Sequence, residues 1–182
     1  MRSVSMHRAV MAVGSTIILL AIGIVLQSCG AYSFTGSSTQ AKTISLTEFY
    51  NNADLGPANM GQTFTNGLKT YLIQNSNLTV ITDEGELQMS GEIMDFRLNP
   101  ISPVSSGNDN ERNTASSTRL TITVRVTYVN TLDETMSFKD KSFSFYKDFD
   151  NDQNFSDIEE QLTRQIFDQL MLDIYNASIA NW

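Results

Sequence analysis

Two reactive side-chain types occur only once in this chain. Cys29 is the sole cysteine and His7 the sole histidine among 182 residues. A thiol and an imidazole held together could perform nucleophilic catalysis, with the histidine accepting the proton of the attacking group. Cys29 has no second cysteine with which to form an internal disulfide. The first question is therefore what the N-terminal segment that holds both residues is built to do.

The segment that precedes Cys29 has the layout of an export signal. Arg2 and Arg8 form a positive head, and Ala9–Leu26 is an uncharged, largely apolar run. A positive head, an apolar stretch and small or polar residues at its end are typical of a secretory signal. The apolar run is also close to the lower length limit of a membrane-spanning helix, so a retained anchor is the competing interpretation.

The four residues Leu26-Gln27-Ser28-Cys29 resemble the bacterial lipobox, in which a lipid-modified cysteine becomes the new N-terminus. We therefore predict that residues 1–28 are a lipoprotein signal peptide and that Cys29 is lipidated. An incidental buried cysteine is the remaining alternative. Several acyl chains on one residue anchor a protein stably. Gly30 follows, with no aspartate beside it, and by resemblance to lipoprotein sorting this favours the outer membrane. The Ser-, Thr- and Gly-rich residues 29–41 are predicted to be a lipidated N-terminus and flexible spacer.

Loss of residues 1–28 would narrow the range of functions. It removes His7, and acylation occupies Cys29, so catalytic triads and histidine-rich zinc sites are excluded. No glycine-rich phosphate-binding motif is present. We predict no catalytic residues, no metal and no cofactor, with a carboxylate-based hydrolase as a minor alternative. The formal net charge of −8 becomes −10 without Arg2 and Arg8. An acidic surface argues against nucleic acid or a bare anionic membrane as partner.

The remaining residues, 42–182, are predicted to form one α+β domain. Alternating apolar residues indicate strands, and apolar residues at helical spacing indicate two helices. The expected strands cover residues 42–50, 78–82, 87–98, 119–130 and 135–149, and the expected helices 57–75 and 156–177. The apolar positions change parity near Ile93-Met94 and near Asp140-Lys141, which predicts a β-bulge at each place. The predicted architecture is a two-layer sandwich, with two helices on one face of a mostly antiparallel, four- to five-stranded sheet.

Two irregular stretches attract functional hypotheses. The long segment Asn99–Thr118 is either a loop that inserts into a partner, with Arg112 among its contacts, or a plain hairpin excursion. The segment Asp148–Glu159 places oxygen-bearing side chains at EF-hand spacing, but Gln153 stands where the sharp turn needs glycine. We favour a strand-to-helix turn over a cation site, with Ser156 and Glu159 forming a capping box.

Taken together, the lipobox with CGAYSFTG, the strand LTITVRVTYVN and the ending FSFYKDFDNDQNFSDIEEQLTRQIFDQLMLDIYNASIANW resemble the LptE-type lipopolysaccharide-assembly lipoproteins. The resemblance implies an outer-membrane lipoprotein that lies as a plug inside an LptD-type β-barrel and helps deliver lipopolysaccharide. The tentative residues for contact with the barrel or with lipopolysaccharide are Arg97, Arg112, Arg119 and Arg125. Their alternative interpretation is a solvated strand face. A stand-alone ligand-binding lipoprotein, with an apolar cleft between helices and sheet, is the second functional hypothesis.

Overall fold

The computed structural model describes residues 39–101 and 117–180. The predicted signal peptide, Cys29, Arg112 and most of the Asn99–Thr118 segment lie outside the described residues. In this part of the chain six strands and two α-helices follow one another, with a short 3-10 helix, η2 (Glu134–Met136). The strands are β1 (Thr43–Leu46), β2 (Tyr50–Asn51), β3 (Thr79–Ile81), β4 (Leu87–Ile101), β5 (Ser117–Asn130) and β6 (Phe138–Asp150). The helices are α2 (Met60–Asn75) and α3 (Phe155–Ser178).

The six strands form one mixed sheet in the order β3-β1-β4-β5-β6, with β2 also paired to β4. The three long strands β4, β5 and β6 form an antiparallel meander, as predicted. The prediction of four to five mostly antiparallel strands was wrong in number and for one edge. Residues 42–50 split into β1 and β2, which both run parallel to β4. Strand β3 is parallel to β1 because α2 carries the chain back to the starting end of the sheet.

Both predicted bulges are confirmed. The β4–β5 register shifts between Ile93 and Asp95, so that Met94 is the extra residue. The β5–β6 register shifts between Val126, opposite Lys141, and Tyr128, opposite Phe138. At the second bulge Asp140 has a φ of 55°, a backbone conformation that few residues other than glycine adopt. Each bulge moves the later apolar side chains back to the helix-facing side of the sheet.

The helix starts differ from the prediction in detail. Helix α2 begins at Met60, three residues after the expected start at Pro57. At the start of α3 the cap is Asn154, whose side chain accepts a hydrogen bond from the backbone N–H of Ser156. The predicted capping box was therefore wrong about the residue. Ser156 lies inside the first turn, because Asn154 already occupies the position at which asparagine side chains cap well.

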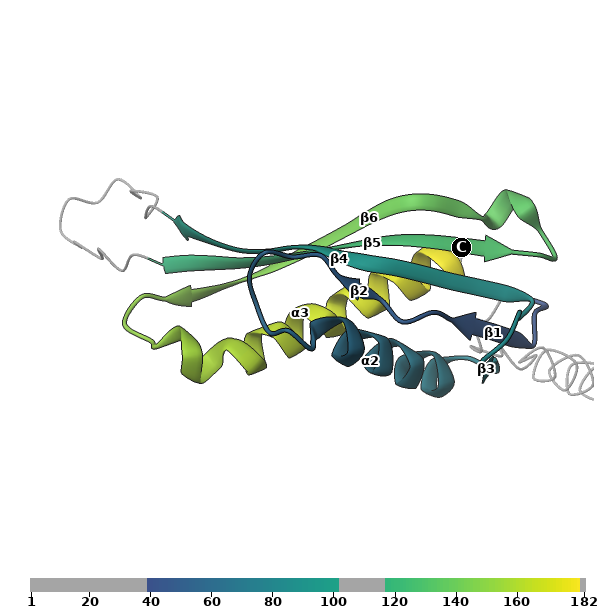
Figure 1. Ribbon diagram of the computed structural model, residues 1–182, viewed down its shortest axis with the longest axis horizontal. Helices are drawn as coiled ribbons and strands as arrows, with labels where there is room; N and C mark the ends of the chain where they lie inside the picture. Colours follow the sequence, from purple (N-terminus) through teal and green to yellow (C-terminus); the bar gives the residue numbers. More distant parts are fainter. Residues whose placement is uncertain (1–38, 102–116, 181–182) are drawn as a thin grey trace, which may run out of the picture. The chain divides into compact units, whose positions relative to one another are not determined.

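Both helices lie on the same side of the sheet (Figure 1), which makes a two-layer domain. They run side by side in the same direction. Phe64 packs edge-on against Phe167 with a ring-centroid separation of 4.9 Å, and Tyr71 packs against Tyr175 at 5.7 Å. Between these contacts a Cβ on Gly67 would lie 3.1 Å from Met171 Sδ, so the absence of a side chain permits this close approach.

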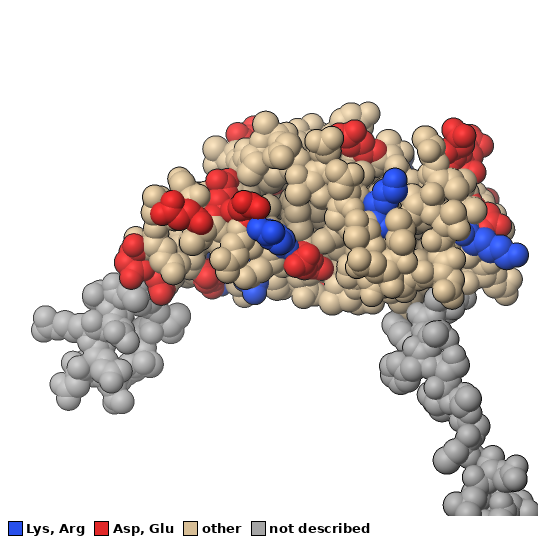
Figure 2. Space-filling view, turned by 90° about the horizontal axis from the view of Figure 1, so that it is seen from below, with Lys and Arg blue, Asp and Glu red and all other residues tan. Residues whose placement is uncertain are grey.

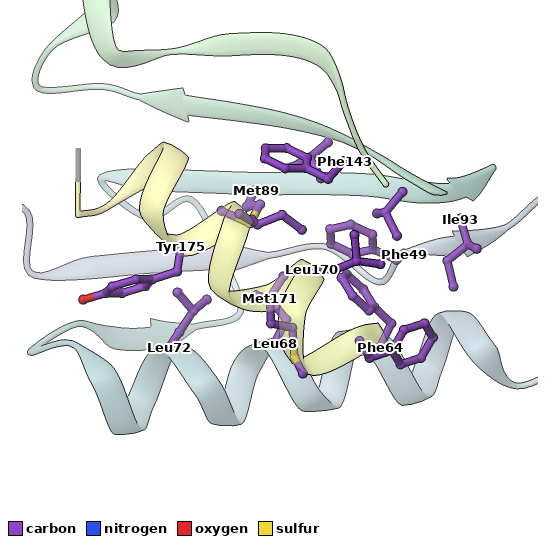
Figure 3. Packing of buried hydrophobic residues seen from close by; sticks show 14 of the residues in the cluster. Phe49, Phe64, Leu68, Leu72, Met89, Ile93, Phe143, Leu170, Met171 and Tyr175 are labelled. Atoms are coloured by element: carbon purple, nitrogen blue, oxygen red, sulfur yellow. The ribbon is translucent and has the colours of Figure 1, made fainter. Parts of the chain in front are cut away.

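The space between the helices and the sheet is filled by apolar side chains (Figure 3). Phe49, which follows β1, stacks edge-on against Phe64 of α2 at 5.1 Å, and Phe64 in turn meets α3. The inward residues of the central strand β5 are all fully buried: Leu120, Ile122, Val124, Val126 and Tyr128. The core therefore fixes the sheet to the helices and leaves the opposite face of the sheet uncovered by either helix. No helix among the described residues is long and apolar enough to cross a membrane.

Candidate binding face of the sheet

The side of the sheet turned away from the helices carries the three described arginines that the sequence singled out. On β5 most residues between the buried positions are half-buried and polar, and they include Arg119, Thr121, Thr123 and Arg125. Side chains alternate across a strand, so these four lie on one face together. We call this surface, made by the outward residues of β4, β5 and β6, the open sheet face.

Arg125 lies at the centre of the open sheet face. It is directly opposite Glu92 of β4, and its Nη1 is 3.6 Å from Glu92 Oε1. The same Glu92 carboxylate accepts a hydrogen bond from the side-chain amide of Asn52, just after β2. A single carboxylate therefore balances the arginine and ties the short parallel edge of the sheet to the meander.

Arg119 is held in a planar, two-bond contact with Asp148 of β6. Its Nε is 2.7 Å from Oδ1 and its Nη2 is 2.9 Å from Oδ2, a fork geometry that suits guanidinium and carboxylate. The Arg119 Cζ also lies 3.6 Å from the centre of the Tyr146 ring, a cation–π contact. The hydrogen bonds to Arg119 lower the pKa of Asp148, and those to Asp148 raise the pKa of Arg119. Both groups therefore remain charged around neutral pH.

Arg97 of β4 pairs with Asp95, two residues away on the same strand. Arg97 faces Thr121 and Asp95 faces Thr123 across the β4–β5 ladder. Its side chain is 60% exposed, more than the 35% of Arg119 or the 36% of Arg125. Every described candidate arginine thus has a carboxylate partner on the open sheet face, and the fourth candidate, Arg112, lies outside the described residues.

Hydroxyl groups fill the space between these ion pairs. Thr123 Oγ1 and Ser144 Oγ are 3.0 Å apart across β5 and β6. Near the end of the same face, Ser117 Oγ donates to Asp150 Oδ1 at 3.3 Å. The result is a surface whose charges are matched locally and which carries hydroxyl groups that can both donate and accept hydrogen bonds, beside the exposed apolar side chain of Val129. An anion would have to compete with a carboxylate for each of the described arginines, whereas a polar protein surface would meet many hydrogen-bonding groups.

The segment with EF-hand spacing is the end of β6, a turn and the start of α3, which confirms the strand-to-helix prediction. Asp148 is engaged by Arg119, and Asp150 Oδ1 accepts a hydrogen bond from Ser117 Oγ at 3.3 Å. Within residues 39–101 and 117–180, no group of three or more His, Cys, Asp or Glu side chains could hold a metal ion.

The predicted Asn99–Thr118 segment is shorter than the sequence suggested. Strand β4 continues to Ile101, which pairs with Ser117 at the start of β5. The ladder therefore absorbs both ends of the segment, and residues 102–116 lie outside the described part of the chain. The hairpin formed by β4 and β5 carries that segment at its tip.

The partners of these arginines could not be predicted from local sequence patterns. Glu92, Asp95 and Tyr146 had no predicted role, and Asp148 was considered only as part of the stretch with EF-hand spacing. The alternation of β5 placed Arg119 and Arg125 on one face, but the identity of their neighbours depends on strand register. Once the two bulges are counted, the register places Glu92 opposite Arg125 and Asp148 opposite Arg119. Counting residues along the strands with both bulges included would therefore have identified these partners.

Comparison with known proteins gives a family match over most of the domain. The model of the LptE family, described as lipopolysaccharide-assembly, matches residues 41–178. The comparison with curated proteins finds no match.

Solved structures similar to this chain include the hypothetical protein CT253 from Chlamydia trachomatis, with 11% identity, 78% of this chain and 99% of that chain covered, and a TM-score of 0.49. A minor lipoprotein from Acinetobacter baumannii has 16% identity, coverage of 74% and 89%, and a TM-score of 0.44. The lipoprotein GNA1162 from Neisseria meningitidis has 8% identity, coverage of 71% and 97%, and a TM-score of 0.38. Because the family model spans residues 41–178, the chain belongs to the LptE family of lipopolysaccharide-assembly proteins.

Proposed function

We propose that this protein is an outer-membrane lipoprotein, anchored through acyl chains on Cys29, that plugs an LptD-type β-barrel and assists lipopolysaccharide assembly. The role is non-enzymatic. Within it, the open sheet face is the surface that meets the inner wall of the barrel. The observation that carries this assignment is the locally matched charge and the hydroxyl-rich character of that face.

The chemistry of a barrel lumen supports this choice of surface. The interior of an outer-membrane barrel is polar, so a plug must offer hydrogen-bonding groups rather than a broad apolar patch. An unpaired arginine that loses its water on docking is costly, whereas a paired and hydrogen-bonded arginine loses much less. On the open sheet face Arg119 is paired in the fork geometry with Asp148, and Arg125 is paired with Glu92. The face can therefore be covered by a polar wall without leaving either charge isolated.

Direct contact with lipopolysaccharide is a finer part of the proposal. An anionic lipid must displace a carboxylate from Arg119 or Arg125, which already have partners on neighbouring strands. Arg97 is the described candidate best placed for such contact, because its side chain is the most exposed of the three. Arg112, outside the described residues, is the second arginine that we assign to this role.

The stand-alone ligand-binding hypothesis required an apolar cleft between the helices and the sheet. In the described residues that space holds the packed rings of Phe49, Phe64 and Phe167 together with the rest of the core. The cleft between helices and sheet that this hypothesis required is therefore filled by core side chains.

The test is co-purification of the full chain from outer membranes in mild detergent, with mass spectrometry of its companions. We expect a stoichiometric large β-barrel. Ser144→Lys places a long cation on the open sheet face, midway along the edge strand β6, where Ser144 is exposed and outside the core. This variant should lose most of the barrel.

Thr70→Lys is the matched control, because Thr70 is exposed on α2, on the opposite side of the domain. Equal barrel recovery for Ser144→Lys and wild type would remove the open sheet face from the proposal. A wild-type protein that never brings a barrel would overturn the function itself.

A further inference from the structure

A groove lies on the other side of the domain, between the N-terminal halves of α2 and α3. Its volume is about 520 Å³, within the range of pockets that bind small ligands or a few side chains. Met60 from α2 and Phe167 and Met171 from α3 form its nearly buried floor. The groove ends at Gly67, where Met171 crosses over α2 and the two helices touch.

The rim of the groove is acidic, and all of its charged residues come from α3. Glu159, Glu160 and Asp168 line it from α3, together with a single cation, Arg164. Arg164 donates to Glu160 Oε1 at 3.0 Å, whereas Glu159 and Asp168 form no ion pair within the described residues. The α2 side contributes no charged side chain to the lining. Figure 2, which looks onto this side of the molecule, shows more acidic than basic side chains on it.

A buried hydroxyl in the groove has no partner. Thr163 lines the groove and is 7% exposed, and its Oγ1 makes no hydrogen bond among the described residues. Hydroxyls inside a helix commonly bond to the carbonyl one turn back. Thr65, Thr70 and Ser178 all do so here, at 2.7, 2.9 and 2.7 Å. Thr163 makes no such bond although it is buried, and buried polar groups without a partner are rare and call for an explanation.

We propose that this groove receives a basic segment of a protein partner. Separate basic side chains of that segment pair with Glu159 and Asp168, which lie about 13.5 Å apart along α3. An apolar side chain between them lies over Met60 and Phe167, and a polar group of the segment bonds to Thr163 Oγ1. The acidic rim repels phosphate-bearing lipid headgroups, which argues for a protein segment as the occupant. The inference rests on the proposed function, since we assign the segment to the same β-barrel.

The decisive experiment reverses charge inside and outside the groove. Asp168→Lys and Asp173→Lys change the net charge equally on the same helix, but Asp173 does not line the groove and bonds to Gln169. Each full-length variant is co-expressed with the barrel and purified from outer membranes at rising NaCl concentration. We expect Asp168→Lys to retain on the order of tenfold less barrel than Asp173→Lys, because like charges would meet across the interface.

Thr163→Val tests the hydroxyl separately, because valine has a similar shape and lacks the polar atom. The free variant should be at least as heat-stable as wild type, since an unpaired buried hydroxyl is removed. Its complex with the barrel should nevertheless dissociate at lower salt. A complex as salt-resistant as wild type would show that the hydroxyl meets no partner, and would overturn that part of the inference.

Failure of this inference is distinguishable from failure of the proposed function. If Asp168→Lys keeps the barrel while Ser144→Lys loses it, the groove is not an interface and the plug function stands. If the wild-type chain never retains a barrel, both fail together.

A photo-crosslinker in place of Thr63, which is exposed and lines the groove, reports the occupant directly. A barrel peptide rich in Lys or Arg supports the proposal, and an acidic peptide or no adduct overturns it.

Discussion

The open sheet face and the groove between the helices both carry several charged side chains, yet their charges are organised differently. On the sheet, Glu92 and Asp148 come from strands next to the arginines that they neutralise. In the groove, the acids lie on α3, and the α2 residues that line the groove include no cation. A sheet can therefore neutralise its charges across neighbouring strands. Two adjacent helices of unequal charge instead leave a negative potential that a basic partner can neutralise.

The largest effect is expected from a core substitution that destabilises the whole domain, and with it both the open sheet face and the groove. Phe64 joins the two layers, with Phe49 on one side and Phe167 on the other. Phe64→Ala should lower the free energy of unfolding by about 3–5 kcal/mol, because it leaves a cavity in a fully buried site. Chemical denaturation of the full chain measures this. A loss below about 1 kcal/mol would mean that the layers do not depend on this contact.

Removal of the buried hydroxyl of Tyr128, on the helix-facing side of the sheet, should not lower stability. Tyr128 is fully buried, and its hydroxyl has no hydrogen-bond partner in the described part of the chain. Burial raises its pKa to about 12, against an ordinary value of 10.0. Tyr128→Phe should therefore leave stability unchanged at neutral pH or raise it by up to about 1 kcal/mol.

The same substitution should matter more in alkali. Because the folded-state pKa of Tyr128 is raised, stability falls once the pH exceeds 10.0, where the unfolded chain releases the phenol proton more readily. The Phe variant should lose less stability than wild type between pH 10 and 12. Melting temperatures of wild type and Tyr128→Phe measured across this pH range test the prediction. Equal losses in both proteins would refute it.

Acid sensitivity is predicted at the end of the sheet, away from both surfaces. Glu86 accepts hydrogen bonds from the backbone N–H groups of Lys42 and Thr43, where β1 begins. The bond from Lys42 is the main cause of its lowered pKa. A lowered pKa means that this stabilisation is complete above the ordinary value of 4.5 and is lost as the pH falls through the folded-state value.

Glu86→Gln should consequently flatten the fall in melting temperature below pH 4.5. Glu134→Gln, at an exposed position in η2, is the control and should retain the wild-type slope. A slope unchanged by Glu86→Gln would place the acid sensitivity elsewhere.

The smallest effect is expected where the charge is already matched. Arg119→Lys keeps the positive charge but removes the fork geometry and reduces the contact with Tyr146, since lysine is not planar. We expect a slight drop in melting temperature and an upward shift of the Asp148 pKa towards its ordinary value. NMR titration of the Asp148 carboxyl measures the second effect, and an unchanged pKa would show that the two-bond contact is not formed in solution.

Parts of this fold could be predicted because they show in the local spacing of apolar residues along the sequence. The parity changes near Ile93 and Asp140 revealed both bulges, and the apolar spacing revealed both helices. The parallel pairing of β1 with β3 and β4 could not be read in this way, because it joins short segments far apart in the chain. The cap of α3 was misassigned because Asn154 and Ser156 are both good capping residues two positions apart.

The candidate site was half predictable for a similar reason. A strand pattern tells which residues share a face, so Arg119 and Arg125 were grouped correctly. It does not tell which residue of the next strand stands opposite, because one bulge changes every pairing beyond it. The groove could not be predicted, since its apolar floor combines side chains of two helices that are far apart in the sequence and meet only in the folded domain.

The bulge at Lys139 and Asp140 also bears on how the length of this chain can vary among relatives. Two residues there stand opposite the single Thr127, and one of them has a φ of 55°. Deletion of Asp140 would turn the bulge into a regular ladder and leave Asp148 opposite Arg119. Deletion of one residue a few positions later, at Ser144, would turn Phe145 and Phe149 to the opposite face. Gains and losses of single residues should therefore be tolerated at this corner and rejected along the rest of β6.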